Sequence, residues 1–220
     1  NHFFLFFKKK IKELYLNSNA YNKKISIVND NNLKYRPSPN LLDCLVKYDK
    51  KKIKIEDYSL NSIWQNNSLN KKDHKNLQSF FWLFSLDLKS SKKDIQNIIL
   101  NWIEKNNRYN SENWKVSIVS KRIIAWISNS KLTYEEGELE YKQNFNKIVK
   151  KQVNHLVNEI EKSQLFEEKI IGCSAIILAG LSFKDQDRYL NFGLNLLKKI
   201  IKIYFDNNCF PKSRNVKHLN

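Results

Sequence analysis

Three polar residues within one short stretch, Asn154, His155 and Asn158, have side chains suited to acid–base chemistry. An imidazole takes up or releases a proton near neutral pH, and an amide can hydrogen-bond a carboxylate. At about 100° per residue along a helix, these side chains point away from an apolar stripe that includes Val153 and Leu156. The pattern fits a site held on a rigid helix, and it also fits an ordinary solvated helix face.

The segment that follows this helix would support such a site from behind. Residues 170–181 are apolar almost all round, and a helix of that kind is normally covered on every side. We therefore expect the helix that carries His155 to be followed by a fully buried helix.

The rest of the chain beyond residue 60 also has helical periodicity. Only 4 Gly and 3 Pro are present, which favours long helices over a many-stranded fold. Short polar loops are expected near 106–113, 133–137 and 183–187, so successive helices return antiparallel. Further helices are expected at 72–88, after an N-cap at Ser90 or Ser91, at 117–129, and from about 187 to 205. The predicted fold class is all-α, a stack of antiparallel helical hairpins.

Two regions are distinguished. Residues 1–60 are predicted to form a less regular N-terminal arm, with a short basic amphipathic helix at 3–16, a breaker cluster at 36–39 and a possible strand at 50–60. Residues 61–220 are predicted to form the helical domain. Because the chain begins with Asn and ends in KHLN, we expect a fragment of a longer protein.

Composition narrows the classes of partner and cofactor. The 220 residues are 41% hydrophobic and 13% aromatic, as in a globular core, and the net charge of +17 favours a polyanionic partner. No nucleic acid is expected, because the lysines are scattered over most helices rather than gathered in one stripe. Cys44, Cys173 and Cys209 are predicted to be free thiols, and no His pair has metal-ligand spacing. We expect no metal, no cofactor and no membrane span.

Four local patterns, in this order, resemble the heparinase II/III-like family of polysaccharide lyases, as a divergent bacterial branch. The first is Trp114 followed by residues 120–127, SKRIIAWI, and the second is Asn154-His155-Leu156. The third is the run IIGCSAIILAGLSF, and the fourth is residues 206–215, DNNCFPKSRN. The resemblance covers about residues 60–220. It implies an incomplete (α/α) toroid, a β-sandwich domain beyond Asn220, and a periplasmic location, with a cytoplasmic one as the alternative.

The same resemblance implies β-elimination on an anionic, uronate-containing polysaccharide. Such a lyase neutralises the uronate carboxylate, removes the C5 proton and protonates the leaving O4. By resemblance, Asn154 and His155 are the catalytic pair. The substrate-binding residues implied with them are Arg122, Asn158, Ser213, Arg214 and His218. For Arg122 and Arg214 a structural salt bridge remains the alternative.

This sequence also departs from the family pattern. The Tyr that follows the Ser-containing turn in many relatives is missing after Ser213, and the double glycine of that turn is Asn207-Asn208. The acid at O4 is then a Tyr from elsewhere, or His218, or absent. Two alternatives to the lyase follow: a non-catalytic relative that binds anionic glycans, and a basic helical-repeat protein that binds nucleic acid or a protein.

Two expectations concern the geometry of the site and of the last helix. We expect Arg122, Asn154 and His155 to line one concave surface with Ser213 and Arg214, with His155 off the buried face. We also expect the apolar faces of the last helix to be partly uncovered, at Leu194, Leu197 and Ile201.

Overall fold

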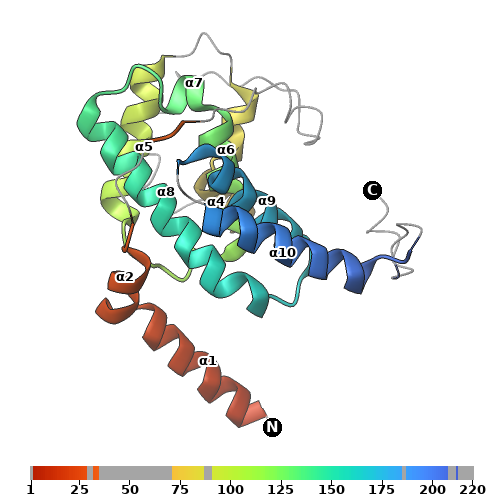
Figure 1. Ribbon diagram of the computed structural model, residues 1–220. Coiled ribbons are helices and arrows are strands. Elements are labelled where there is room, and N and C mark those ends of the chain that lie inside the picture. Colours follow the sequence, from red (N-terminus) through yellow and green to blue (C-terminus); the bar gives the residue numbers. More distant parts are fainter. Residues whose placement is uncertain are drawn as a thin grey trace.

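The computed structural model describes residues 2–28, 32–34, 71–86, 91–184, 187–207 and 212, and most of these are helical. The predicted all-α class is confirmed (Figure 1). Leu33 and Phe183 form an isolated antiparallel bridge. The elements in chain order are α1 (His2–Leu16), α2 (Asn19–Ile25), α4 (Lys71–Ser79), the 3₁₀ helix η2 (Phe81–Ser85), α5 (Lys92–Asn106), α6 (Val116–Ser128), α7 (Ser130–Thr133), α8 (Leu139–Glu159), the 3₁₀ helix η3 (Ile160–Lys162), α9 (Phe166–Ser182) and α10 (Asp187–Tyr204).

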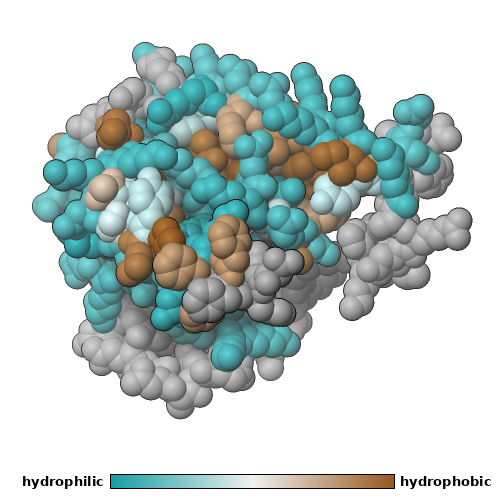
Figure 2. Space-filling model, turned by 90° about the horizontal axis from the view of Figure 1, so that it is seen from below, coloured by the Kyte–Doolittle hydropathy of each residue, from teal (hydrophilic) through white to brown (hydrophobic). Residues whose placement is uncertain are grey.

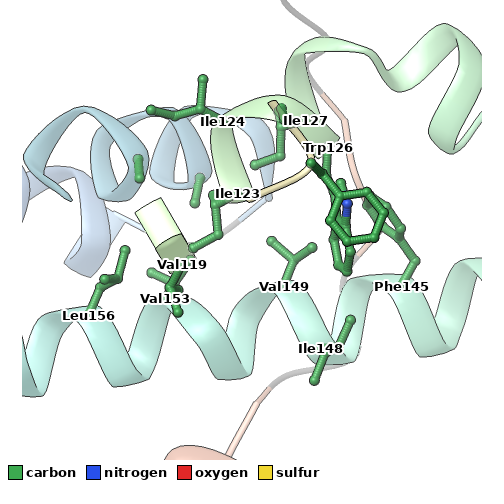
Figure 3. Packing of buried hydrophobic residues seen from close by; sticks show 14 of the residues in the cluster. Val119, Ile123, Ile124, Trp126, Ile127, Phe145, Ile148, Val149, Val153 and Leu156 are labelled. Carbon is green, nitrogen blue, oxygen red and sulfur yellow. The ribbon is translucent and has the colours of Figure 1, made fainter. Parts of the chain in front are cut away.

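The core forms where α6 and α8 face one another. Figure 3 shows Val119, Ile123 and Trp126 of α6 directed toward the apolar stripe of α8. That stripe is the one expected from the spacing, and its buried members include Val149, Val153 and Leu156, each 0% exposed. Burying a side chain of this size contributes roughly 1.5–3 kcal/mol, so this contact fixes how α8 is rotated about its axis.

Helices α9 and α10 form a closely packed hairpin. A Cβ atom at Gly180 would lie 2.6 Å from the backbone nitrogen of Leu190, and one at Gly193 would lie 2.6 Å from the Ile177 side chain. The two helices can approach this closely because both positions lack a side chain. The other contacts of α9 are mainly with α6.

The expectation that the apolar helix is covered on every side is wrong. Ser174 of α9 is exposed, and Leu181 is 51% exposed. Among the described residues, α9 is covered mainly on the faces toward α6, α8 and α10. The prediction for the last helix is confirmed, since Leu194 and Ile201 of α10 are exposed and Leu197 is half-buried.

The helix predicted at 72–88 is interrupted. Helix α4 ends at Ser79, and Phe80 adopts a left-handed conformation with φ of 55° before η2 begins. Left-handed backbone is unfavourable for a bulky residue. Aromatic packing offsets the cost here, because the Phe80 ring is 0% exposed and lies edge-on to Trp102 and Trp126 at 6.1 and 5.1 Å.

The helix boundaries predicted for the middle of the chain agree with the structure. Ser91 is the N-cap of α5, and its hydroxyl accepts a hydrogen bond from the Asp94 amide at 3.3 Å. Helix α6 begins one residue before the predicted start, and the loop near 106–113 lies between α5 and α6. The breaker cluster at 36–39 and the possible strand at 50–60 lie outside the described residues.

The N-terminal arm is more regular than predicted where it is described. Besides the expected basic helix, α2 forms at Asn19–Ile25, because the Ser18 hydroxyl caps its first turn by accepting from the Tyr21 amide at 3.1 Å. Figure 1 shows α1 extending away from the body, while α2 lies against α8. Figure 2 views the side from which α1 extends and shows apolar patches among hydrophilic residues. The exposed apolar residues of α1 are Phe4, Phe6, Phe7, Ile11, Leu14 and Tyr15.

Candidate functional site

The polar side chains of α8 that suggested a site lie on the face turned toward α2. The opposite face is anchored against α6, so Asn154, His155 and Asn158 are directed as the helical spacing predicted. The prediction that His155 lies off the buried face is wrong, since the residue is 2% exposed. Its own side of the helix is covered by the N-terminal segment and by the loop before α6.

Both ring nitrogens of His155 are hydrogen-bonded. Nε2 lies 2.8 Å from the backbone oxygen of Trp114, and Nδ1 lies 2.8 Å from the hydroxyl of Tyr21. A carbonyl oxygen can only accept, so Nε2 carries the proton and Nδ1 accepts from the Tyr21 hydroxyl. The geometry therefore selects one neutral tautomer.

Burial also keeps this imidazole neutral. Loss of solvation lowers the pKa of His155 to about 4, and it outweighs the Glu159 carboxylate and the hydrogen bond to Trp114, which act to raise the pKa. The ring is surrounded by aromatic groups, with Trp114 edge-on at 5.4 Å and Tyr109 at 5.5 Å. In this arrangement both of its nitrogens are occupied, so it has no free position from which to take a substrate proton.

One turn further along α8, the buried Glu159 forms two ion pairs. Its carboxylate is 2.7 Å from Lys12 of α1 and 2.7 Å from Lys162 of η3. Burial acts to raise the pKa of Glu159, but the hydrogen bonds from the two lysines outweigh it and the pKa is lowered. His155 and Glu159 both line a pocket of about 520 Å³ beneath α1.

Asn154 is directed to a different pocket. Its amide nitrogen donates to the backbone oxygens of Ile25 at 2.9 Å and Ile27 at 3.2 Å. Its amide oxygen accepts from the hydroxyl of Tyr189 at 2.7 Å and from the guanidinium of Arg188 at 3.2 Å. One side chain of α8 thus joins the end of α2 to the start of α10.

Arg188 and Tyr189 complete this arrangement. The guanidinium of Arg188 donates to the Tyr189 hydroxyl at 2.8 Å, and this hydroxyl in turn donates a hydrogen bond to the amide oxygen of Asn154. Burial raises the pKa of Tyr189, although Arg188 acts in the opposite direction. The phenol therefore remains protonated at neutral pH. These groups lie at the wall of a pocket of about 420 Å³, which Asn158, Lys24 and Phe192 also line.

The expectation that Arg122 lies on a surface with this pair is wrong. Arg122 is 0% exposed, and burial lowers the pKa of its guanidinium well below the usual range. It donates to Gln152 at 2.9 Å, to the backbone oxygen of Gln78 at 2.7 Å and to that of Asn113 at 3.0 Å. The guanidinium also lies over the Trp102 ring at 3.9 Å. Neutral acceptors and an aromatic face satisfy this cation, so its role in the structure is to join elements in the core.

The remaining site predictions divide into two groups. Asn158 lines the 420 Å³ pocket, and its amide donates to the backbone oxygen of Asn154 at 2.6 Å. Ser213, Arg214 and His218 lie outside the described residues. The catalytic roles assigned to Asn154 and His155 stay predictions.

Sequence reasoning missed the residues that contact the pair. Tyr21, Arg188 and Tyr189 are 134, 34 and 35 positions from their partners on α8. The spacing of residues within one helix does not predict contacts between residues so far apart in the chain. An available signal was the Arg-Tyr dipeptide at the start of α10, which places a cation and a phenol together at one helix end.

The described part of the chain has neither a cluster of metal ligands nor a membrane-spanning helix. No group of three or more His, Cys, Asp or Glu side chains in the described part could hold a metal ion. None of the helices described is long and apolar enough to cross a membrane. Cys173 is a buried free thiol, and burial raises its pKa to about 11. The other cysteines, Cys44 and Cys209, lie outside the described residues. Comparisons with protein-family models, curated proteins and solved structures give no match for this chain.

Proposed function

We propose that this chain is the helical part of a lyase that cleaves an anionic, uronate-containing polysaccharide by β-elimination. The observation that carries the proposal is the hydrogen-bonded set of Asn154, Tyr189 and Arg188 at the wall of the 420 Å³ pocket. The resemblance of the motif order to the heparinase II/III-like family supplies the reaction.

The pocket has the composition that an acidic sugar requires. Lys24 and Arg188 are its cations, and the lining contains no carboxylate among the described residues. Asn158 adds an amide, and the half-buried ring of Phe192 adds an apolar surface for a sugar face. A uronate carboxylate can be held by Arg188, since a guanidinium binds carboxylates through two parallel hydrogen bonds.

Tyr189 supplies the acid that the sequence lacked after Ser213. Its phenol keeps its proton at neutral pH and has Arg188 beside it, which stabilises a developing phenolate. The Tyr189 side chain is 2% exposed and its hydroxyl donates to Asn154. We assign it the protonation of O4 on the condition that substrate binding turns this hydroxyl from Asn154 to O4. Asn154 positions this phenol and is a positioning residue in this scheme.

The arrangement of the helices is part of the same proposal. The antiparallel α9–α10 hairpin, packed on α6 and α8, is compatible with one sector of an incomplete (α/α) toroid. In such a toroid the helix starts and loops on one side surround the substrate groove, and the start of α10 contributes Arg188 and Tyr189.

A second candidate is a relative that binds anionic glycans without cleaving them. The observation in its favour is the state of His155, whose nitrogens are both occupied and whose pKa is lowered to about 4. A proton acceptor for C5 must then come from another residue, or the step does not occur.

An activity screen separates the two candidates. The purified protein is incubated with a panel of uronate polymers while the absorbance of the unsaturated product is followed. Tyr189→Phe removes the phenol hydroxyl and should lower the rate by at least about a hundredfold. Tyr204→Phe, on the same helix but outside the pocket lining, is the matched control and should retain the rate.

The binding result decides the remaining cases. Saturable binding of a uronate polymer without product would support the glycan-binding candidate. Absence of both binding and cleavage for every polymer in the panel would contradict both candidates.

A further inference from the structure

A third pocket, of about 350 Å³, lies between α2, the end of α5 and the first half of α8. It is separate from the two pockets already described and shares no lining residue with them. Its polar lining residues are Asn22, Ser26, Asn107, Arg108, Asn144, Lys147 and Lys151.

The charge of this pocket is of one sign. Arg108, Lys147 and Lys151 line it, and no carboxylate does so among the described residues. The overall positive charge of the chain does not by itself explain a pocket lined by cations alone. The pocket under α1 combines its lysines with Glu13, Glu112, Glu159 and Glu168. In the 350 Å³ pocket the cations have no such compensation.

Lys151 is the innermost of these cations. It is 7% exposed, and its ammonium group donates to the backbone oxygen of Asn107. Burial, together with the charges of Arg108 and Lys147, lowers the pKa of Lys151 to about 8. A buried ammonium next to two like charges is an unfavourable arrangement, which a bound anion would relieve.

A neutral group in the same wall lacks a hydrogen-bond partner. The buried amide oxygen of Asn22 has no hydrogen bond, while the nearby Ser26 hydroxyl donates to the Asn22 backbone oxygen at 2.6 Å. Asn22, Asn107 and Asn144 all line the pocket, and the NH₂ group of an amide carries two donors. Donors from an amide and from the cations could then converge on one ligand.

We propose that this pocket binds an oxyanion: a sulfate, phosphate or carboxylate group. Three cations, nearby amides and a partly enclosed volume match the chemistry of such groups, which accept several charge-assisted hydrogen bonds. The site does not depend on the lyase proposal, because it uses none of the residues of the Asn154 pocket.

Calorimetric titration with sodium sulfate at constant ionic strength tests the site. The variant Lys147→Gln changes an exposed side chain, so folding is retained, and sulfate binding should weaken at least about tenfold. Lys151→Gln is the second variant. Lys93→Gln removes the same charge from an exposed position on α5 outside the pocket, and binding should stay within about twofold of the original.

A second readout follows the buried amine itself. Bound sulfate favours the charged form, so the pKa of Lys151, measured by NMR of the lysine side chains, should rise when sulfate is added. Titration with a uronate monosaccharide identifies the source of the anion. Tighter binding than sulfate indicates a group carried by a sugar, and weaker or equal binding indicates a free ion.

Two results would overturn the proposal. One is the absence of saturable sulfate binding. The other is equal weakening by Lys147→Gln and Lys93→Gln, which would show that only the net charge of the chain matters.

Discussion

The two faces of α8 are both buried, but by different interactions. The face toward α6 is covered by aliphatic and aromatic side chains, with Val153 and Leu156 at 0% exposure. The face toward α2 is covered by groups that are hydrogen-bonded to it. His155 is hydrogen-bonded to the N-terminal segment and to the Trp114 carbonyl, and Asn154 to the N-terminal segment and to α10. The polar character of a helix face therefore does not show that the face is open to solvent or substrate.

The difference has an energetic consequence. Apolar burial is nondirectional, and its loss scales with the volume removed. Buried hydrogen bonds contribute less when formed, but removing one partner leaves the other desolvated and unpaired. Substitutions on the two faces should therefore change the free energy of unfolding by different amounts and with a different dependence on pH.

The largest effect is expected on the apolar face. Leu156→Ala should lower the free energy of unfolding by about 3 kcal/mol, because it leaves a cavity against α6. Urea denaturation measures the change. Val157→Ala, at a half-buried neighbouring position, is the control and should cost less. Equal costs at both positions would mean that the α6–α8 contact is not close-packed.

The polar face should respond to pH through His155. The folded pKa of about 4 lies below the ordinary value of 6.5, so the folded state binds fewer protons than the unfolded state between these values. The stabilisation is fully present above about pH 6.5 and is lost as the pH falls toward 4, by up to roughly 3 kcal/mol. Unfolding midpoints across this range measure it, and His155→Gln should flatten the profile. An unchanged slope in the variant would assign the pH dependence to other groups.

Asn154 and Asn158 should differ although both are amides on the same face. Asn154→Ala breaks the link between α2 and α10 and should cost about 2 kcal/mol, because two carbonyl oxygens and a phenol lose their partner. Asn158→Ala loses a bond to a carbonyl within its own helix and should cost less than about 0.5 kcal/mol. Thermal unfolding of both variants under identical conditions gives the comparison, and similar costs would contradict it.

The smallest effect is expected at the hydroxyl that contacts His155. Tyr21→Phe keeps the ring and removes the donor to Nδ1, at a cost of about 1 kcal/mol. Tyr15→Phe is the matched control on α1, since Tyr15 is 46% exposed, and the variant should stay within about 0.5 kcal/mol. Chemical denaturation of the two variants decides whether the hydroxyl or only the ring stabilises the contact.

Periodicity predicted the all-α class, most helix boundaries and the apolar face of α8, because each follows from neighbours within two turns. It failed at Phe80, where long-range aromatic packing stabilises a left-handed residue. It also failed at Arg122, because a cation buried among neutral acceptors has no local sequence signature. The partners of His155 and Asn154 lie more than thirty residues away in the chain and required the structure.

The state of the His155 ring tests the account most directly. Long-range ¹H–¹⁵N NMR spectra of the histidine side chains, recorded from about pH 3.5 to 8 and assigned with His155→Gln, report the tautomer and the pKa together. We expect a single neutral tautomer protonated on Nε2, with a pKa of about 4. A ring that titrates near 6.5, with both tautomers populated, would show that this face of α8 is open and that His155 is available for chemistry.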